Sequence, residues 1–176
     1  MKILFASRLV AYKNLTFVYS AISEMKRNKS WPANSKFLVM GSGPEEGHLR
    51  KLMTDLDIKT EVTMLGIVNE ERVLEETKGC SFVLAPALTE FSPNFVLRGI
   101  SMGKPFLISG ENGLAFATPP QFVFDPRDKN DFIAKLRWII EHEDEARILV
   151  SEIKFKQSWN DVLSANVKII RQVIGP

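Results

Sequence analysis

Residues 90–105 read E-F-S-P-N-F-V-L-R-G-I-S-M-G-K-P and carry the strongest pattern in the chain. The pattern predicts a turn, a helix and a sharp stop before a strand. Ser92 is a residue type that caps helices through its hydroxyl, and Pro93 suits the first helical position, where its missing N–H is not needed. Gly103 is typical of the position just past a helix end. Glu90 would then lie just before a helix N-terminus, which attracts anions, so this stretch predicts a site for a ligand with hydroxyl and phosphate groups.

Short apolar runs surround this stretch and alternate with segments of helical periodicity. The runs that suit buried strands span residues 2–6, 37–40, 62–65, 81–85, 105–109 and 122–124. Apolar residues recur at helical spacing between them, as at 13–26, and Asp128 is a suitable cap for a later helix. A last helix is expected from about residue 160 to about residue 173, lying across the domain. This order predicts an α/β fold, a Rossmann-like doubly wound parallel sheet of about six strands with helices on both faces.

The composition is that of one soluble globular domain. The chain has 176 residues, of which 45% are hydrophobic and 25% charged, with a formal net charge of +2. So small a charge, with scattered Lys and Arg, argues against nucleic acid as a partner. Cys80 is the only cysteine, which excludes an internal disulfide and fits a reducing compartment. No apolar run reaches the roughly 20 residues of a transmembrane helix, and the start is too short for a signal peptide, so we expect a cytoplasmic chain.

Candidate binding residues follow the ends of the expected strands, where parallel sheets bind their ligands. Arg8 and Lys13 flank the loop after the first strand. Two cations there favour a diphosphate, although two solvated surface charges would give the same pattern. Gly41 and Gly43 stand in G-S-G-P after the second strand. This spacing is not a dinucleotide fingerprint, and the bend either lets backbone approach a ligand or is only a turn.

Other candidates for chemistry are weaker. His48 and His142 are far apart in the chain and belong to no ligand-spaced cluster, so no metal site is expected. Cys80 lies at an expected strand and predicts a buried structural thiol. The acidic pairs at 70–71 and 75–76 and the run at 141–145 are typical of solvated helix faces.

Taken together, these segments resemble the nucleotide-sugar-binding half of retaining glycosyltransferases with two Rossmann-like domains, the GT-B type, of the group 1 or family 4 kind. The family pattern is Glu, seven residues, Glu, often written E-G-F-P-N-V-L-L-E and followed by G-K-P. Glu90, Pro93, Asn94 and residues 103–105 fall on that pattern here, whereas Arg98 stands where the second Glu should be.

Two further segments are similar to motifs of the same family. The stretch S-R-L-V-A-Y-K-N at 7–14 resembles G-R-L-x-x-x-K-G, with Ser7 and Asn14 in place of the glycines, and the turn is expected to be slightly altered. G-S-G-P at 41–44 is similar to the family's G-x-G-P, which lies beside the nucleotide base. By the same analogy, residues 65–68 would line the base.

The resemblance implies roles for the matched residues. Arg8 and Lys13 would hold the donor diphosphate and offset its charge as it leaves, so neither a metal nor a separate cofactor is expected. Glu90 would bind hydroxyls of the transferred sugar, and it is the main catalytic candidate together with Arg8 and Lys13. The amides of residues 91, 92 and 94 would face a phosphate. The donor, a UDP-sugar or GDP-sugar, would be bound by Arg8, Lys13, Gly41, Gly43, Ile67, Val68, Glu90, Phe91, Ser92, Asn94 and Arg98.

Arg98 is the main departure from the family pattern. The second Glu of the family accepts hydrogen bonds from ribose hydroxyls, and a guanidinium group has no acceptor. Arg98 would instead reach a phosphate or pair with a nearby acid. Replacing Arg98 by Glu is expected to restore an acceptor for the ribose and to strengthen nucleotide binding.

The resemblance implies that residues 1–176 form a single donor-binding domain, with the acceptor domain either missing from a fragment or supplied by a partner subunit. The whole enzyme would transfer a hexose, with retention, to a glycan or lipid acceptor in polysaccharide biosynthesis, and peripheral membrane association is compatible with this. The isolated chain would be inactive. The alternative is a degenerate, non-catalytic domain that binds a partner. A nucleotide-sugar epimerase is disfavoured because the further acid and base residues it needs are not found.

Overall fold

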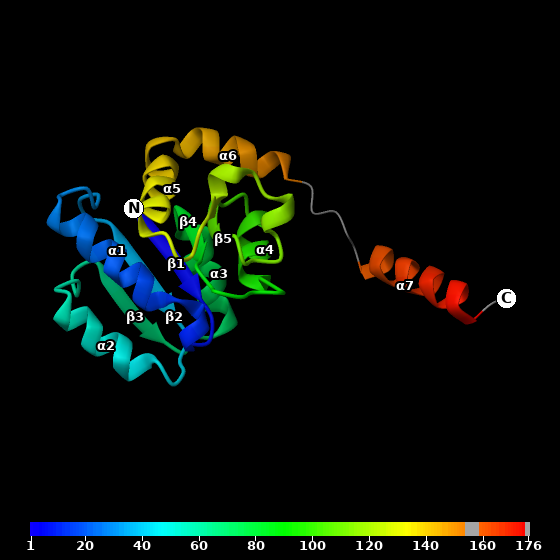
Figure 1. The fold of residues 1–176 in the computed structure, drawn as a ribbon, viewed down its shortest axis with the longest axis horizontal. Helices are drawn as coiled ribbons and strands as arrows, with labels where there is room; N and C mark the ends of the chain where they lie inside the picture. Colours follow the sequence, from blue (N-terminus) through cyan, green and yellow to red (C-terminus); the bar gives the residue numbers. More distant parts are fainter. Residues whose placement is uncertain (154–158, 175–176) are drawn as a thin grey trace.

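The structure is a computed structural model that describes residues 1–153 and 159–174 (Figure 1). Six strands alternate with helices: β1 (Lys2–Ala6), β2 (Lys36–Met40), β3 (Val62–Gly66), β4 (Phe82–Ala85), β5 (Phe106–Ser109) and β6 (Val123–Phe124). The helices are α1 (Leu15–Arg27), α2 (Glu46–Asp55), α3 (Glu70–Gly79), α4 (Asn94–Ser101), α5 (Lys129–Glu141), α6 (Glu143–Glu152) and α7 (Trp159–Ile174). Three short 3-10 helices lie at Ala11–Lys13, Ala115–Ala117 and Pro120–Phe122.

The six strands form one parallel sheet with the order β3-β2-β1-β4-β5-β6. Strands β2 and β3 follow one another on one side of β1, and β4, β5 and β6 follow one another on its other side. The strand order therefore reverses between β1 and β4, which pair through Ile3 and Phe82 and through Leu4 and Val83. This arrangement confirms the doubly wound α/β fold. Every strand begins and ends within one residue of its predicted bounds.

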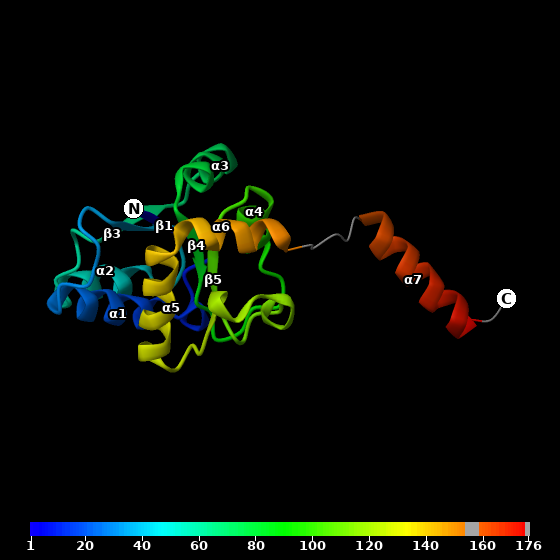
Figure 2. The ribbon, with the colours of Figure 1, turned by 90° about the horizontal axis from the view of Figure 1, so that it is seen from above.

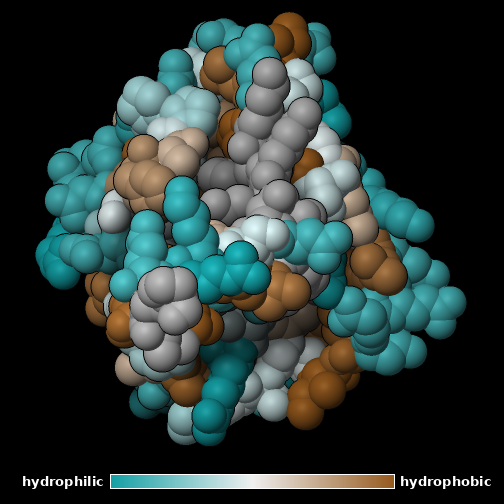
Figure 3. Space-filling view, turned by 90° about the vertical axis from the view of Figure 1, so that its right-hand side faces the viewer, coloured by the Kyte–Doolittle hydropathy of each residue, from teal (hydrophilic) through white to brown (hydrophobic). Residues whose placement is uncertain are grey.

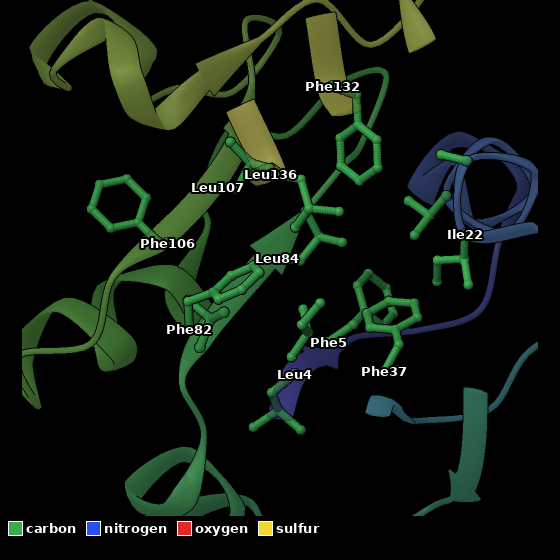
Figure 4. Packing of buried hydrophobic residues seen from close by; sticks show 14 of the residues in the cluster. Leu4, Phe5, Ile22, Phe37, Phe82, Leu84, Phe106, Leu107, Phe132 and Leu136 are labelled. Atoms are coloured by element: carbon green, nitrogen blue, oxygen red, sulfur yellow. The ribbon is translucent and has the colours of Figure 1, made fainter. Parts of the chain in front are cut away.

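Helices cover both faces of the sheet. Figure 2 shows α3 and α4 on one side, and α1, α2 and α5 on the other. Because both faces are covered, consecutive residues of a strand are buried, as Ile3, Leu4 and Phe5 of β1 are. Their side chains pack with residues of other strands and helices, including Phe37, Phe82 and Leu136 (Figure 4).

Helix α7 departs from the prediction. Its bounds are one residue wider at each end than the expected 160–173, but it stands away from the α/β domain and does not lie across it (Figures 1 and 2). Its apolar residues Leu163, Ile170 and Val173 are 62%, 52% and 81% exposed. Figure 3, seen from the α7 side, shows hydrophobic side chains in separate patches among hydrophilic ones. Periodicity predicts which residues share a helix face, but it does not identify what that face contacts.

The helices are too short or too polar to cross a bilayer throughout the part of the chain that the structure describes.

Candidate functional site

A pocket of about 380 Å³ opens where β1 and β4 end side by side. Its walls are residues 5–7 at the end of β1, residues 84–87 at the end of β4, and residues 92–96 around the start of α4, with Lys13, Val73, Glu90 and Arg98. The pocket thus lies beyond the carboxyl ends of the strands, at the point where the strand order reverses. This is the position at which open α/β sheets bind their ligands, and the volume lies within the range of small-molecule sites.

Lys13 and Glu90 form an ion pair in this pocket, although they are 77 positions apart in the chain. The Lys13 Nζ contacts the Glu90 Oε2, and the two side chains are only 10% and 19% exposed. Lys13 ends the 3-10 helix Ala11–Lys13, where its N–H donates to the carbonyl of Val10. The structure therefore brings together two of the predicted site residues in surroundings that keep most water away.

The loop after β5 fixes the backbone of Glu90. The Glu90 N–H donates to the carbonyl of Glu111 at 3.2 Å, and the Gly113 N–H donates to the carbonyl of Glu90 at 2.7 Å. A Cβ on Gly113 would lie 2.6 Å from the Phe91 carbonyl oxygen, so only glycine permits this approach. Sequence reasoning missed this support. The N-G dipeptide at 112–113 marks a turn, but it does not indicate which loop the turn packs against.

Asn14 adopts a left-handed conformation, with φ of 60°, between the 3-10 helix and α1. Asn is one of the few residue types that tolerate this conformation in place of glycine. Its side-chain amide donates to the carbonyl of Pro126 at 3.1 Å, which ties the Lys13 turn to the loop after β6. Asn14 therefore supports a tight turn at the position where the family pattern has a glycine.

The start of α4 differs from the prediction. Helix α4 begins at Asn94, and Pro93 is the N-cap. Among the residues that the structure describes, the Ser92 hydroxyl is hydrogen-bonded only to the Asn94 side chain, at 3.5 Å. The predicted Ser92 cap is therefore wrong. The ψ of Pro93 is 63°, so the chain is not yet helical there.

Three pocket-lining residues at this helix start have free backbone donors. Among the described residues, no acceptor is within hydrogen-bond reach of the N–H groups of Ser92, Phe95 and Val96, whereas the N–H of Asn94 donates to the Ser92 carbonyl. Val96 is fully buried, and an unpaired buried N–H is costly. An anion in the pocket would supply acceptors for the N–H groups of the exposed Ser92 and the partly buried Phe95.

Arg98 lines the same pocket and pairs with an acid, one of the two expected alternatives. Its Nη2 lies 2.5 Å from Oε1 of Glu70, the first residue of α3. The two side chains are 31% and 66% exposed. Asn69 caps α3 by accepting a hydrogen bond from the Arg72 N–H at 2.9 Å, which fixes the start of the helix.

The glycines of G-S-G-P have a structural reason of their own. A Cβ on Gly41 would lie 2.0 Å from the Ser7 carbonyl oxygen, and one on Gly43 would lie 2.2 Å from that of Leu9. The Leu9 N–H donates to the Ser42 carbonyl at 2.8 Å. The close approach at these glycines therefore joins the loops after β1 and β2, and a contact with a nucleotide base stays a prediction.

The other predicted residues lie outside the pocket wall. Arg8 is exposed on the loop after β1, and the side chains of Ile67 and Phe91 are largely exposed. Val68 is partly buried and packs against the core. Their predicted contacts with a ligand stay predictions.

The acidic residues of α3 were predicted to form a solvated helix face, and for Glu76 this prediction is wrong. Glu76 is buried, and its carboxylate contacts Lys2 Nζ at 2.7 Å and Arg72 Nη2 at 2.5 Å. The hydrogen bond from Lys2 lowers the pKa of Glu76. Cys80 is the expected buried thiol, and burial raises its pKa to about 11. Within the described residues, no three His, Cys, Asp or Glu side chains gather closely enough to hold a metal ion.

Comparison with known proteins agrees with the fold. The family model for group 1 glycosyl transferases matches residues 1–142. The catalytic domain of cholesterol-alpha-glucosyltransferase from Helicobacter pylori superposes with a TM-score of 0.74 at 25% identity, covering 87% of this chain and 94% of that one. No curated protein is similar enough in sequence to count as a match.

Two longer proteins share the fold. Sucrose-phosphate synthase from Thermosynechococcus elongatus has a TM-score of 0.76 at 16% identity, covering 98% of this chain and 45% of that one. Anabaena HepE, solved in complex with UDP, has a TM-score of 0.72 at 16% identity, covering 99% and 49%. The chain thus spans less than half the length of these two proteins.

Proposed function

The chain belongs to the group 1 glycosyl transferases, and we propose that it binds the nucleotide-sugar donor in the pocket between the ends of β1 and β4. The donor would be a UDP-sugar or GDP-sugar, and its hexose would pass with retention to a glycan or lipid acceptor. The observation that carries this proposal is the buried Lys13–Glu90 pair beside the free N–H groups of α4.

The two side chains suit the two parts of such a ligand. Lys13 carries three N–H donors, and Glu90 has two acceptor oxygens, so one mutual contact leaves capacity on both. The ammonium group is matched to a diphosphate oxygen, and the carboxylate is matched to sugar hydroxyls. Because the pair is nearly buried, both interactions would act in a medium of low dielectric constant, where they are stronger than in water.

The leaving diphosphate needs charge stabilisation, and the pocket offers it without a metal. Lys13 and the unpaired N–H groups of Ser92 and Phe95 belong to the wall of one pocket before any ligand arrives. Donors fixed in advance stabilise charge that develops during a reaction because they need no reorganisation. Arg8, exposed on the adjoining loop, would add a second cation when the ligand is bound.

The acceptor would be bound by a second domain or a partner subunit. This chain spans 45% and 49% of the two longer proteins that share its fold. Closing such a second wall over the pocket would exclude water and complete the site. We therefore propose that this domain alone binds the donor but does not transfer sugar.

A panel of nucleotides tests donor binding. UDP, GDP and ADP, each beside its parent nucleoside, would be titrated into the protein by calorimetry. We expect at least one diphosphate to bind, and to bind more tightly than its nucleoside, because the pocket's cation and amides face the phosphates. Failure of all three to bind, or equal affinity of diphosphate and nucleoside, would contradict the proposal.

The second candidate function is a degenerate, non-catalytic domain that binds a partner and not a nucleotide sugar. Arg98 is the observation that favours it. Arg98 replaces the carboxylate typical of the family at this position, and its guanidinium forms an ion pair with Glu70. This candidate predicts that none of the diphosphates binds, so the same panel separates the two functions.

A further inference from the structure

The Arg98–Glu70 pair lies where the proposed site lacks an acceptor. Arg98 lines the pocket, and its guanidinium can only donate hydrogen bonds. A nucleotide presents ribose hydroxyls, which are best held by an acceptor such as a carboxylate. The nearest carboxylate to Arg98 belongs to Glu70, at 2.5 Å, on another helix. The inference that follows rests on the proposed function.

Glu70 is placed to serve the pocket. It is the first residue of α3, directly after the loop at the end of β3, so it lies at the same edge of the sheet as Lys13 and Glu90. Val73, three positions further along α3, lines the pocket. Residues three apart share a helix face, so Glu70 lies on the pocket side of α3, one turn closer to the open edge.

The ion pair fixes Glu70 without using it up. Arg98 contacts Oε1 of Glu70, and the Glu70 side chain is 66% exposed, which leaves its second oxygen accessible to a ligand. A carboxylate has about four lone-pair sites, and Arg98 needs only one or two of them. The pair also neutralises the charge of Arg98, so the Arg98 guanidinium does not compete with Lys13 for the diphosphate.

We propose that Glu70 is the hydroxyl-binding carboxylate of this donor site and that Arg98 is the residue that positions it. The acceptor has moved from α4 to the start of α3, and the pocket recognises a ribose diol through Glu70. Under this proposal, Arg98→Glu alone does not improve binding, because it places two carboxylates against each other.

The test measures the preference for ribose. UDP, GDP and ADP, and the 2′,3′-dideoxy form of each, are titrated into wild type, Glu70→Ala and the matched control Glu71→Ala. Wild type and Glu71→Ala should prefer the ribose form by roughly tenfold or more, the value of a well-aligned hydrogen bond to a carboxylate. Glu70→Ala should bind the two forms almost equally. Both glutamates are exposed, so circular dichroism should show the same fold in all three proteins.

The charge-swapped protein, Glu70→Arg with Arg98→Glu, gives a second readout. It restores the ion pair with the carboxylate on α4, so the ribose preference lost in Glu70→Ala should return. Glu71→Ala, which leaves the pair intact, remains the control.

The outcomes separate this inference from the proposed function. If a diphosphate binds wild type and Glu70→Ala keeps the full ribose preference, Glu70 is not the acceptor and only this inference fails. If Arg98→Met weakens both forms equally and leaves the nucleoside unaffected, Arg98 is a phosphate ligand and this inference is again overturned. If wild type binds none of the diphosphates, the proposed function fails and takes this inference with it.

Discussion

The Lys13–Glu90 pair is almost buried, whereas the pair that the pocket-lining Arg98 forms with Glu70 keeps much of its surface in water. Each pair joins residues from different elements of the fold. Loops hydrogen-bonded through their backbone hold the first pair, whereas the start of α3 and the last turn of α4 hold the second. The comparison therefore concerns two ion pairs of similar chemistry that differ in their access to solvent.

The difference predicts different roles. Removing one partner of a buried pair leaves an uncompensated charge in a medium of low dielectric constant, which is strongly destabilising. Exposed pairs contribute little to stability, because water and salt screen them. We infer that the Lys13–Glu90 pair stabilises the fold as well as serving the site, and that the Arg98–Glu70 pair contributes little to stability while leaving Glu70 accessible to a ligand.

Breaking the buried pair should have the largest effect. Glu90→Ala leaves the Lys13 ammonium without its partner, and we expect the free energy of unfolding to fall by about 2–4 kcal/mol, somewhat below the range for fully buried pairs because some solvent reaches this one. Urea unfolding followed by circular dichroism measures the change.

The double variant Lys13→Met, Glu90→Ala is the control for this prediction. It removes both charges, so it should be less destabilised than the sum of the two single variants. Strict additivity of the two single losses would show that the two side chains do not interact. It would contradict the claim that the Lys13–Glu90 pair stabilises the fold.

Ligand binding should show an intermediate effect. Arg8→Ala and Lys13→Ala should each weaken a bound nucleoside diphosphate by about 1–3 kcal/mol, the range for charged hydrogen bonds, and should affect the parent nucleoside less. Arg8 is exposed, so its variant should keep the unfolding free energy of wild type within about 0.5 kcal/mol. Calorimetric titration of both ligands measures the losses, and equal losses for diphosphate and nucleoside would place the two cations away from the phosphates.

The exposed pair should matter least for stability. Glu70→Ala should lower the unfolding free energy by only about 0–1 kcal/mol, and added salt should shrink that difference. Glu71→Ala is the matched control, because both residues lie in the first turn of α3 and meet the same helix dipole. A loss from Glu70→Ala as large as that from Glu90→Ala would erase the contrast between the pairs.

The fold was predictable because its signals are local. Each buried strand is a short apolar run bounded by polar or turn residues, and Gly103 ends α4 with a φ of 66°, as its type and position indicated. Asp128 caps α5 by accepting hydrogen bonds from the N–H groups of Asn130 and Asp131, again as predicted. These features depend on neighbours in the sequence, so the sequence alone reveals them.

The site was predictable only in part, because its contacts are distant in the chain. Motif resemblance pointed to Lys13 and Glu90, but their direct pairing depends on how β1 and β4 come together. Glu70 resembled a solvated surface acid, since its partner Arg98 lies on another helix. The predicted position of α7 was wrong because an amphipathic pattern does not indicate which part of the protein the helix contacts.

The claim that the pocket between β1 and β4 binds the diphosphate is tested most directly by titrating UDP, GDP or ADP into ¹⁵N-labelled protein and following the backbone amides by NMR. The account predicts that the largest shifts occur at the N–H groups of Lys13, Ser92 and Phe95. Saturable shifts confined to other parts of the domain, with these amides unchanged, would contradict it.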